Sequence, residues 1–156
     1  MSAVMSVVKT VTVRASQPHA FKIFTAGFTT WWPSAHHIGR ADMAEAVLEQ
    51  REGGRWYERG VDGSECDWGS VLVYDPPNRV VLSWHLNGEW AYDPDPAKAS
   101  EVEVRFIAES PDVTRVELEH RHFERHGGNW EAVARGVDNE NGWAGILRGY
   151  ADIAGA

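Results

Sequence analysis

The sequence predicts an α+β domain in which a curved antiparallel sheet of six to seven strands wraps around a long C-terminal helix. Three observations predict this class. A strand-like segment and a short helix come first, strand-sized segments joined by turn residues follow, and an apolar stripe with helical spacing comes last. Because a helix must bury its apolar stripe, we expect the apolar face of the sheet to be its partner.

The first strand and the first helix are predicted from the N-terminal part of the chain. Residues 7–14 (VVKTVTVR) are rich in β-branched side chains, which favour a strand. Residues 16–18 (SQP) are typical of a helix start, and apolar side chains then recur at helical spacing as far as Phe24. Gly27 and the Trp-Trp-Pro at 31–33 end this helix, so we expect it to be short.

Four strand-sized segments come next, separated by Gly-Gly, Asp-Gly and Asp-Pro-Pro-Asn turns. They are residues 46–51, 55–59, 68–74 and 79–86. Tight connections between successive strands predict an antiparallel meander. The loop that follows, 87–100, carries Trp90 and Tyr92, which could either fold over a pocket as a lid or cover the edge of the sheet.

The last two strands show the clearest alternation. In residues 101–108 (EVEVRFIA) and 114–122 (TRVELEHRH), apolar side chains alternate with charged ones. The pattern places Leu118, His120 and His122 on one face of the final strand, so we expect the two histidines to continue its buried face. Oppositely charged side chains take the solvent face, where they can pair across strands.

The part of the chain after the glycines at 127–128 is predicted to be helical, with Asn129 or Asp138 as candidate caps, and it ends in an amphipathic C-terminal helix. Its apolar side chains recur every three or four positions. They are Trp143, Ile146, Leu147, Tyr150 and Ile153. No internal repeat, low-complexity tract or domain boundary interrupts the chain, so we expect one domain over residues 1–156.

Composition excludes several classes of function. The formal net charge of −8 opposes binding to nucleic acid and to anionic membrane surfaces. We find no secretion signal and no apolar run near the roughly 20 residues that cross a bilayer, so we expect a cytoplasmic protein without membrane insertion. Cys66 is the only cysteine, which rules out an internal disulfide and a CxxC zinc pair.

A family resemblance rests on six segments that together cover nearly the whole chain. They are FTTWWPSAHHIG (28–39), GGRWYERGVDGSECDWGSV (53–71), PPNRVVLSW (76–84), SEVEVRF (100–106), TRVELEHRHFERHG (114–127) and GWAGILRGY (142–150). They resemble the START-like, or SRPBCC, superfamily and, within it, bacterial homologues of the activator of heat-shock-protein-90 ATPase. The resemblance implies the helix-grip fold of the birch-pollen-allergen type, with a deep and mainly apolar cavity between the sheet and the terminal helix.

Tryptophan is unusually frequent, with eight in this chain, and it supplies wide apolar surface for a core or for a cavity wall. We expect several of these rings to surround one apolar space with a few polar groups. The alternative is a filled core without a cavity. The residues expected to bind a ligand are Trp31, Trp32, Trp56, Glu58, Trp68, Trp84, Phe106, Leu118, His120, His122, Trp143 and Leu147.

The histidines of ELEHRHFERHGG (117–128) allow three interpretations. As metal ligands, His120 and His122 would need a third partner, with His85, Glu58 or His36 as candidates. The pattern supplies no confirming ligand and the resemblance supplies no metal, so we expect neither a metal nor a cofactor. As acid–base groups, His120, His122 and Glu58 are the catalytic candidates. The third interpretation is that hydrogen bonds satisfy the histidines, which then only shape the mouth of the cavity.

The function that we expect is binding of a small hydrophobic or aromatic molecule in the cavity between sheet and helix. One alternative is an enzyme of cyclase, dehydratase or hydrolase type, for which the sequence contains no strong evidence. The other is a chaperone-associated interaction module, which the family name implies. Eukaryotic co-chaperones of that name carry a further large N-terminal domain for which this chain has no room. A homodimer through an exposed sheet edge is possible but not required.

Overall fold

The computed structural model describes residues 6–87, 89–128, 130–139 and 142–155, so the candidate cap Asn129 lies outside the described residues. Its centre is a seven-stranded sheet in the order β1-β7-β6-β5-β4-β3-β2, in which every neighbouring pair is antiparallel. The strands are β1 (Val7–Val13), β2 (Met43–Leu48), β3 (Arg55–Gly60), β4 (Glu65–Asp75), β5 (Arg79–Trp84), β6 (Ser100–Ser110) and β7 (Val113–Arg121). The predicted meander is therefore confirmed, with β1 returning to pair with the last strand.

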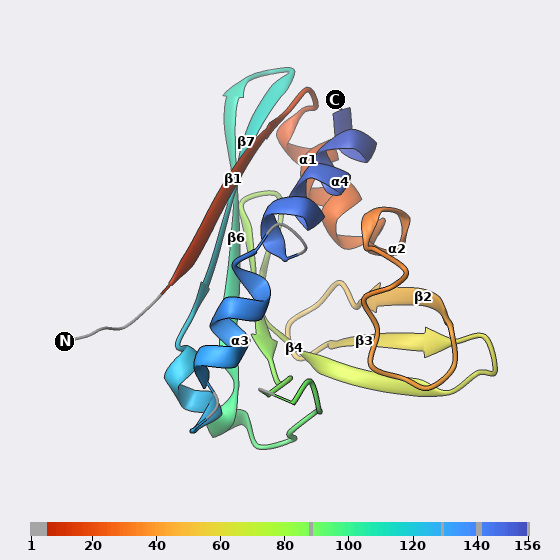
Figure 1. The fold of residues 1–156 in the computed structure, drawn as a ribbon. Coiled ribbons are helices and arrows are strands. Elements are labelled where there is room, and N and C mark those ends of the chain that lie inside the picture. The colour runs from red at the N-terminus through yellow and green to blue at the C-terminus, as the bar shows by residue number, and fades with distance from the viewer. Residues whose placement is uncertain (1–5, 88, 129, 140–141, 156) are drawn as a thin grey trace.

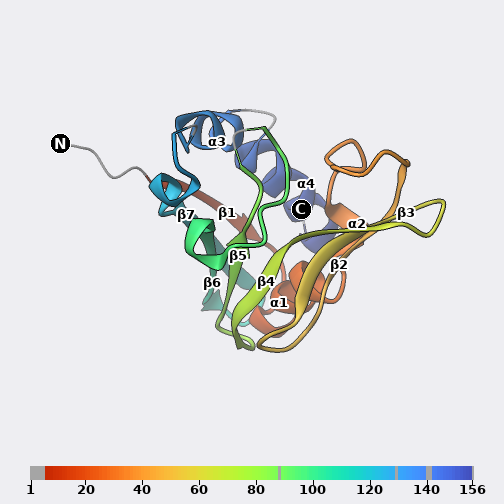
Figure 2. The ribbon, with the colours of Figure 1, turned by 90° about the horizontal axis from the view of Figure 1, so that it is seen from below.

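The helices lie in the hollow of the bent sheet (Figures 1 and 2). They are α1 (Gln17–Thr25), α2 (Phe28–Trp31), α3 (Trp130–Val137) and α4 (Trp143–Gly155), with short 3-10 helices at Pro96–Lys98 and Phe123–His126. In Figure 1, β1, β7 and β6 form one wall, β4, β3 and β2 form the other, and α1, α2 and α4 lie between them. This is the α+β class that the sequence predicts.

The bend of the sheet requires a close approach of backbone at Gly69 in β4. A Cβ atom built there would lie 1.8 Å from the carbonyl oxygen of Ser83 in β5, so only glycine fits. The strand register shifts between Trp56 and Tyr57 and again between Val71 and Val73. Such irregularities increase the local twist, which turns the β2–β4 end of the sheet toward the helices.

Helix α4 is held by the apolar stripe that its sequence predicts. Trp143, Ile146, Leu147 and Tyr150 are all buried, and the Tyr150 hydroxyl donates a hydrogen bond to the Ala20 carbonyl of α1 at 2.7 Å. The bond ties the two longest helices together beneath the sheet. The buried stripe is one turn shorter than the sequence predicts, because its last expected member, Ile153, is 50% exposed.

The prediction that His122 continues the buried face of the last strand is wrong. Strand β7 ends at Arg121, one residue earlier than expected, and His122 has a left-handed backbone with φ of 67°. Its side chain is 36% exposed and lies 3.8 Å from the Glu124 carboxylate. His120, in contrast, is fully buried as predicted. The turn at residue 122 therefore separates two histidines that the alternation had placed together.

None of the helices in the described part of the chain is both long and apolar enough to span a membrane.

Candidate functional site

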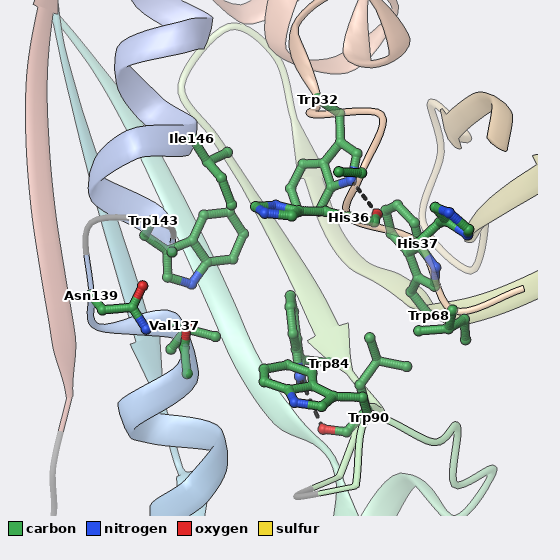
Figure 3. Close-up of a pocket in the computed structure, with 15 residues that line it drawn as sticks. Trp32, His36, His37, Trp68, Trp84, Trp90, Val137, Asn139, Trp143 and Ile146 are labelled. Atoms are coloured by element: carbon green, nitrogen blue, oxygen red, sulfur yellow. Dashed lines mark hydrogen bonds between the residues drawn. The ribbon is translucent and has the colours of Figure 1, made fainter. Parts of the chain in front are cut away.

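The site begins with a cavity of about 440 Å³ between the sheet, the two C-terminal helices and the loop after α2. Figure 3 shows tryptophan rings on several sides of it. The lining residues are Trp32, Ala35, His36, His37, Ile38, Trp68, Trp84, Leu86, Trp90, Gly136, Val137, Asn139, Gly142, Trp143 and Ile146. The cavity is therefore lined mainly by aromatic and aliphatic side chains, which suits an apolar or flat molecule.

Four of the five tryptophans that line the cavity do not offer it their N–H groups, because each of these four indoles donates to a protein acceptor. The four bonds are Trp32 Nε1 to His36 O (2.9 Å), Trp68 Nε1 to Glu58 Oε1 (2.9 Å), Trp84 Nε1 to Leu86 O (3.0 Å) and Trp143 Nε1 to His120 Nδ1 (3.1 Å). These bonds also fix each ring plane. The walls consequently present pre-oriented aromatic surface and few polar atoms.

Glu58 in β3 holds the loop after α2 against the sheet. Its carboxylate, 1% exposed as a residue, accepts hydrogen bonds from the backbone N–H groups of Ile38 (2.6 Å) and Gly39 (3.1 Å) and from the Trp68 indole. A Cβ atom at Gly39 would lie 3.0 Å from Oε2, which leaves little room for a side chain there. Glu58 is thus a structural clamp behind the cavity wall.

The loop that Glu58 holds carries two adjacent histidines with different surroundings. His37 Nδ1 lies 3.0 Å from the Gly39 carbonyl oxygen, to which it can only donate, and 3.7 Å from the Glu58 carboxylate. In Figure 3 the His36 ring extends toward the side of the cavity formed by Trp143, while the His37 ring turns away from it. Burial lowers the pKa of His36 below its ordinary value, which favours the neutral imidazole.

His120 lies behind the cavity wall in a chain of buried hydrogen bonds. Its Nδ1 accepts from Trp143, its Nε2 lies 2.7 Å from Ser100 Oγ, and the same hydroxyl lies 2.7 Å from His126 Nε2. Because an indole can only donate, His120 must carry its proton on Nε2 and donate it to Ser100. Ser100 can then donate to His126. Burial holds the pKa of His120 well below its ordinary value and, with the neighbouring His85, lowers that of His126 to about 4.

His85, His120 and His122, which the sequence suggested as metal ligands, are engaged in hydrogen bonds or point away from one another. Both ring nitrogens of His120 are engaged with protein atoms, and His122 points elsewhere from the turn. His85 is held by the Asp93 carbonyl and the Ser83 hydroxyl, and no group of three or more potential ligands occurs among the described residues. The pairing that the fold creates is His120 with His126, through the Ser100 hydroxyl.

The residues expected to bind a ligand divide into two sets. Trp32, Trp68, Trp84 and Trp143 line the cavity. The others do not: most lie in the core or behind the wall, and His122 lies outside. The residues away from the cavity are Trp31, Trp56, Glu58, Phe106, Leu118, His120, His122 and Leu147.

Sequence reasoning missed that His36 and His37 line the cavity, and named His36 only as a candidate metal ligand. The available signal was their position directly after the Trp-Trp-Pro that ends the helical region, where a loop can present side chains to a pocket.

Trp90 covers one side of the cavity, as one of the two interpretations of its loop requires. Its ring lies against Gly136 of α3, where a Cβ atom would come within 2.4 Å, and 6.4 Å from the Trp84 ring. Tyr92 takes another course and stacks on His85, with ring centroids 5.3 Å apart. The loop therefore spans two environments, with Trp90 on the cavity side.

Comparison with known proteins supports this architecture. Residues 14–154 match the family described as activator of Hsp90 ATPase homolog 1-like protein. A search of curated proteins finds no match. Among solved structures, the chain is 36% identical to an anthrahydroquino-gama-pyrone synthase, Txn09, determined as a complex, over 98% of this chain and 99% of that one, with a TM-score of 0.67.

Two further solved structures resemble the chain. CalC from Micromonospora echinospora, a self-sacrificing resistance protein, is 35% identical over 97% of this chain and 96% of that one, with a TM-score of 0.68. Protein NE0264 from Nitrosomonas europaea, at 12% identity over 96% of this chain and 94% of that one and a TM-score of 0.65, supports the fold alone. Since the family match extends over nearly the entire sequence, the protein belongs to the activator of Hsp90 ATPase homolog 1-like family, with a START-like, helix-grip fold.

Proposed function

We propose that the protein binds a flat aromatic molecule in the tryptophan-lined cavity. The observation that carries the proposal is the set of four cavity indoles whose N–H groups are all bonded to the protein, which leaves ring surface facing the space. Aromatic rings recognise other rings by stacking and edge contacts at low entropic cost. A fused-ring compound suits such walls better than a flexible lipid chain.

The comparisons favour the same class of ligand. The name of Txn09 denotes a fused-ring aromatic compound, and the chain covers nearly all of that protein at 36% identity. The similar identity to CalC, a resistance protein, supports a shared scaffold with different activities. A synthase-type reaction on an aromatic polyketide-like compound is therefore the second candidate. The chaperone-associated function, the homodimer and the cytoplasmic location stay predictions from the sequence.

Replacing Trp84 with leucine should weaken binding of a flat aromatic probe about tenfold, because one stacking wall of the cavity is lost. Isothermal titration with 2-methoxyanthraquinone measures the effect, and thermal unfolding with the probe shows whether binding stabilises the fold.

Trp130→Leu is the matched control, since Trp130 is a partly buried tryptophan of α3 that does not line the cavity. Equal loss of affinity in the two variants would contradict the assigned cavity. If a panel of fused-ring aromatics left both fluorescence and melting temperature of the parent protein unchanged, the binding function itself would be wrong.

A further inference from the structure

His36 is the cavity-lining histidine whose ring makes no hydrogen bond to the described protein atoms. The other lining histidine, His37, is engaged by Gly39 and by the Glu58 carboxylate. The His36 ring is partly buried, sits edge-on to Trp32 with centroids 6.2 Å apart, and extends into the cavity side of the loop (Figure 3). A polar ring that is partly desolvated and unpaired is suited to a partner that arrives with the ligand.

The backbone around His36 is fixed from both sides, so its ring is pre-positioned. Its carbonyl accepts the Trp32 indole N–H at 2.9 Å, and its own N–H donates to the Pro33 carbonyl at 3.0 Å. Two residues further along, the buried Glu58 carboxylate binds the backbone of Ile38 and Gly39. Functional side chains act best when such supports hold them in place before the ligand binds.

The electrostatic surroundings of His36 favour a neutral ligand. The described cavity side chains contributed by β4, β5, α3, α4 and the Trp90 loop are uncharged, and His37 is the other titratable group on the lining. The Glu58 carboxylate lies 3.7 Å from His37 Nδ1 and is occupied by backbone and indole donors. A neutral imidazole offers one acceptor nitrogen and one N–H donor.

We propose that His36 accepts the proton of an aromatic hydroxyl on the bound molecule. This inference rests on the proposed function and assigns an acid–base group to the same cavity. The unprotonated nitrogen of His36 takes the hydroxyl proton, the O–H bond breaks, and its electron pair stays on the oxygen as a phenolate. Burial disfavours a lone imidazolium at this position, so the charge on His36 depends on its pairing with the adjacent phenolate. The proton returns to the phenolate oxygen when the ion pair collapses. The site therefore selects phenolic ligands and activates their oxygen.

The acid–base candidates from the sequence fit this role less well. Both His120 nitrogens are bonded inside the core, His122 lies outside the cavity, and Glu58 is saturated by three donors. His36 differs from all three because its ring reaches the cavity and its nitrogens are unoccupied by the described residues.

Two probes of matched shape test the proposal: 2-hydroxyanthraquinone, whose colour changes when its hydroxyl ionises, and 2-methoxyanthraquinone, which has no acidic hydrogen. We expect the parent protein to bind the hydroxyl compound about tenfold more tightly, equal to about 1.4 kcal/mol, and to lower the pH at which the bound dye ionises. The advantage should shrink as the pH falls, since protonated His36 has no acceptor nitrogen.

Three variants separate proton transfer from simple contact. His36→Phe should remove both the affinity advantage and the shift in dye ionisation. His36→Gln, which keeps a hydrogen-bond acceptor, should retain part of the affinity but not the ionisation shift. His19→Phe, on the exposed surface of α1, should behave as the parent protein does. Thermal unfolding of each variant confirms that it is folded.

The outcomes distinguish the two proposals. If the methoxy compound binds but the hydroxyl compound has no advantage, or if that advantage survives in His36→Phe, the role of His36 is overturned and the binding cavity stands. If neither compound binds the parent protein at concentrations where related aromatics do, the role of His36 is overturned for this ligand class. Failure of every fused-ring aromatic overturns both.

Discussion

Glu58→Ala should lower the free energy of unfolding by about 4 kcal/mol, the largest effect that we expect from a single substitution. Its carboxylate accepts three hydrogen bonds in a site that is almost closed to solvent. Removing it leaves two backbone N–H groups and one indole N–H without acceptors, and each unsatisfied buried donor costs about 1–3 kcal/mol. Urea denaturation measures the change. Glu58→Gln keeps one acceptor oxygen and should cost about half as much.

The control is Glu124→Ala, whose carboxylate is 53% exposed and should change stability by less than about 0.5 kcal/mol. Hydrogen exchange adds a local measurement, because the amides of Ile38 and Gly39 should lose protection first. A Glu58→Ala protein within 1 kcal/mol of the parent would show that the clamp is unimportant. The variant should also bind aromatic probes less well, since the loop that carries His36 would be released.

Stability should fall as the pH is lowered below about 6.5, because two partly or fully buried histidines are neutral in the folded protein. Burial lowers the pKa of His120 and of His126 relative to the unfolded chain. Between the folded and unfolded pKa values the unfolded state binds more protons, so stability is complete above the unfolded value and declines toward acid. For His126, with a pKa of about 4 and a partly exposed ring, we expect a loss of about 2 kcal/mol by pH 4.

The measurement is denaturation at a series of pH values for the parent and for His126→Gln. The glutamine can still accept from Ser100 but does not titrate, so the slope between pH 6.5 and 4 should become shallower. His19→Gln, at an exposed position, provides the control for loss of a histidine. An unchanged slope in His126→Gln would show that titration of His126 does not contribute to the pH dependence of stability. Carboxylates titrate in all three proteins, so only the difference between slopes is diagnostic.

Local sequence patterns were sufficient to predict the order of the helices and strands. Alternation in β6 and β7 and the three-to-four spacing in α4 reflect single-element geometry, and the buried Leu118 and Leu147 follow from it. Strand ends are less well specified. The strand preceding His122 stops where the backbone turns left-handed, and a pattern of alternating residues contains no signal for that turn.

The site was only partly predictable because it depends on contacts between distant segments. Tryptophans were expected at the cavity, but whether a given ring faces the space depends on where the folded sheet places it: Trp84 lines the cavity, whereas Trp56 is fully enclosed. The Glu58 carboxylate binds a backbone amide about 20 residues earlier in the chain. The Ser100 hydroxyl connects His120 to His126, which lies beyond the turn at residue 122. Such pairings are set by the folded sheet and have no local signature.

The saturated indoles have a consequence for how this scaffold can change its ligand. The N–H bonds that orient Trp32, Trp68, Trp84 and Trp143 run into the protein, so exchange of one occupant for another breaks none of them. The choice of ligand then depends on the thickness and shape of the molecule and on the loop that carries His36 and His37. Substitutions of the side chains in that loop would change the polar side of the cavity while the four indole bonds, which use backbone and Glu58 acceptors or His120, are kept.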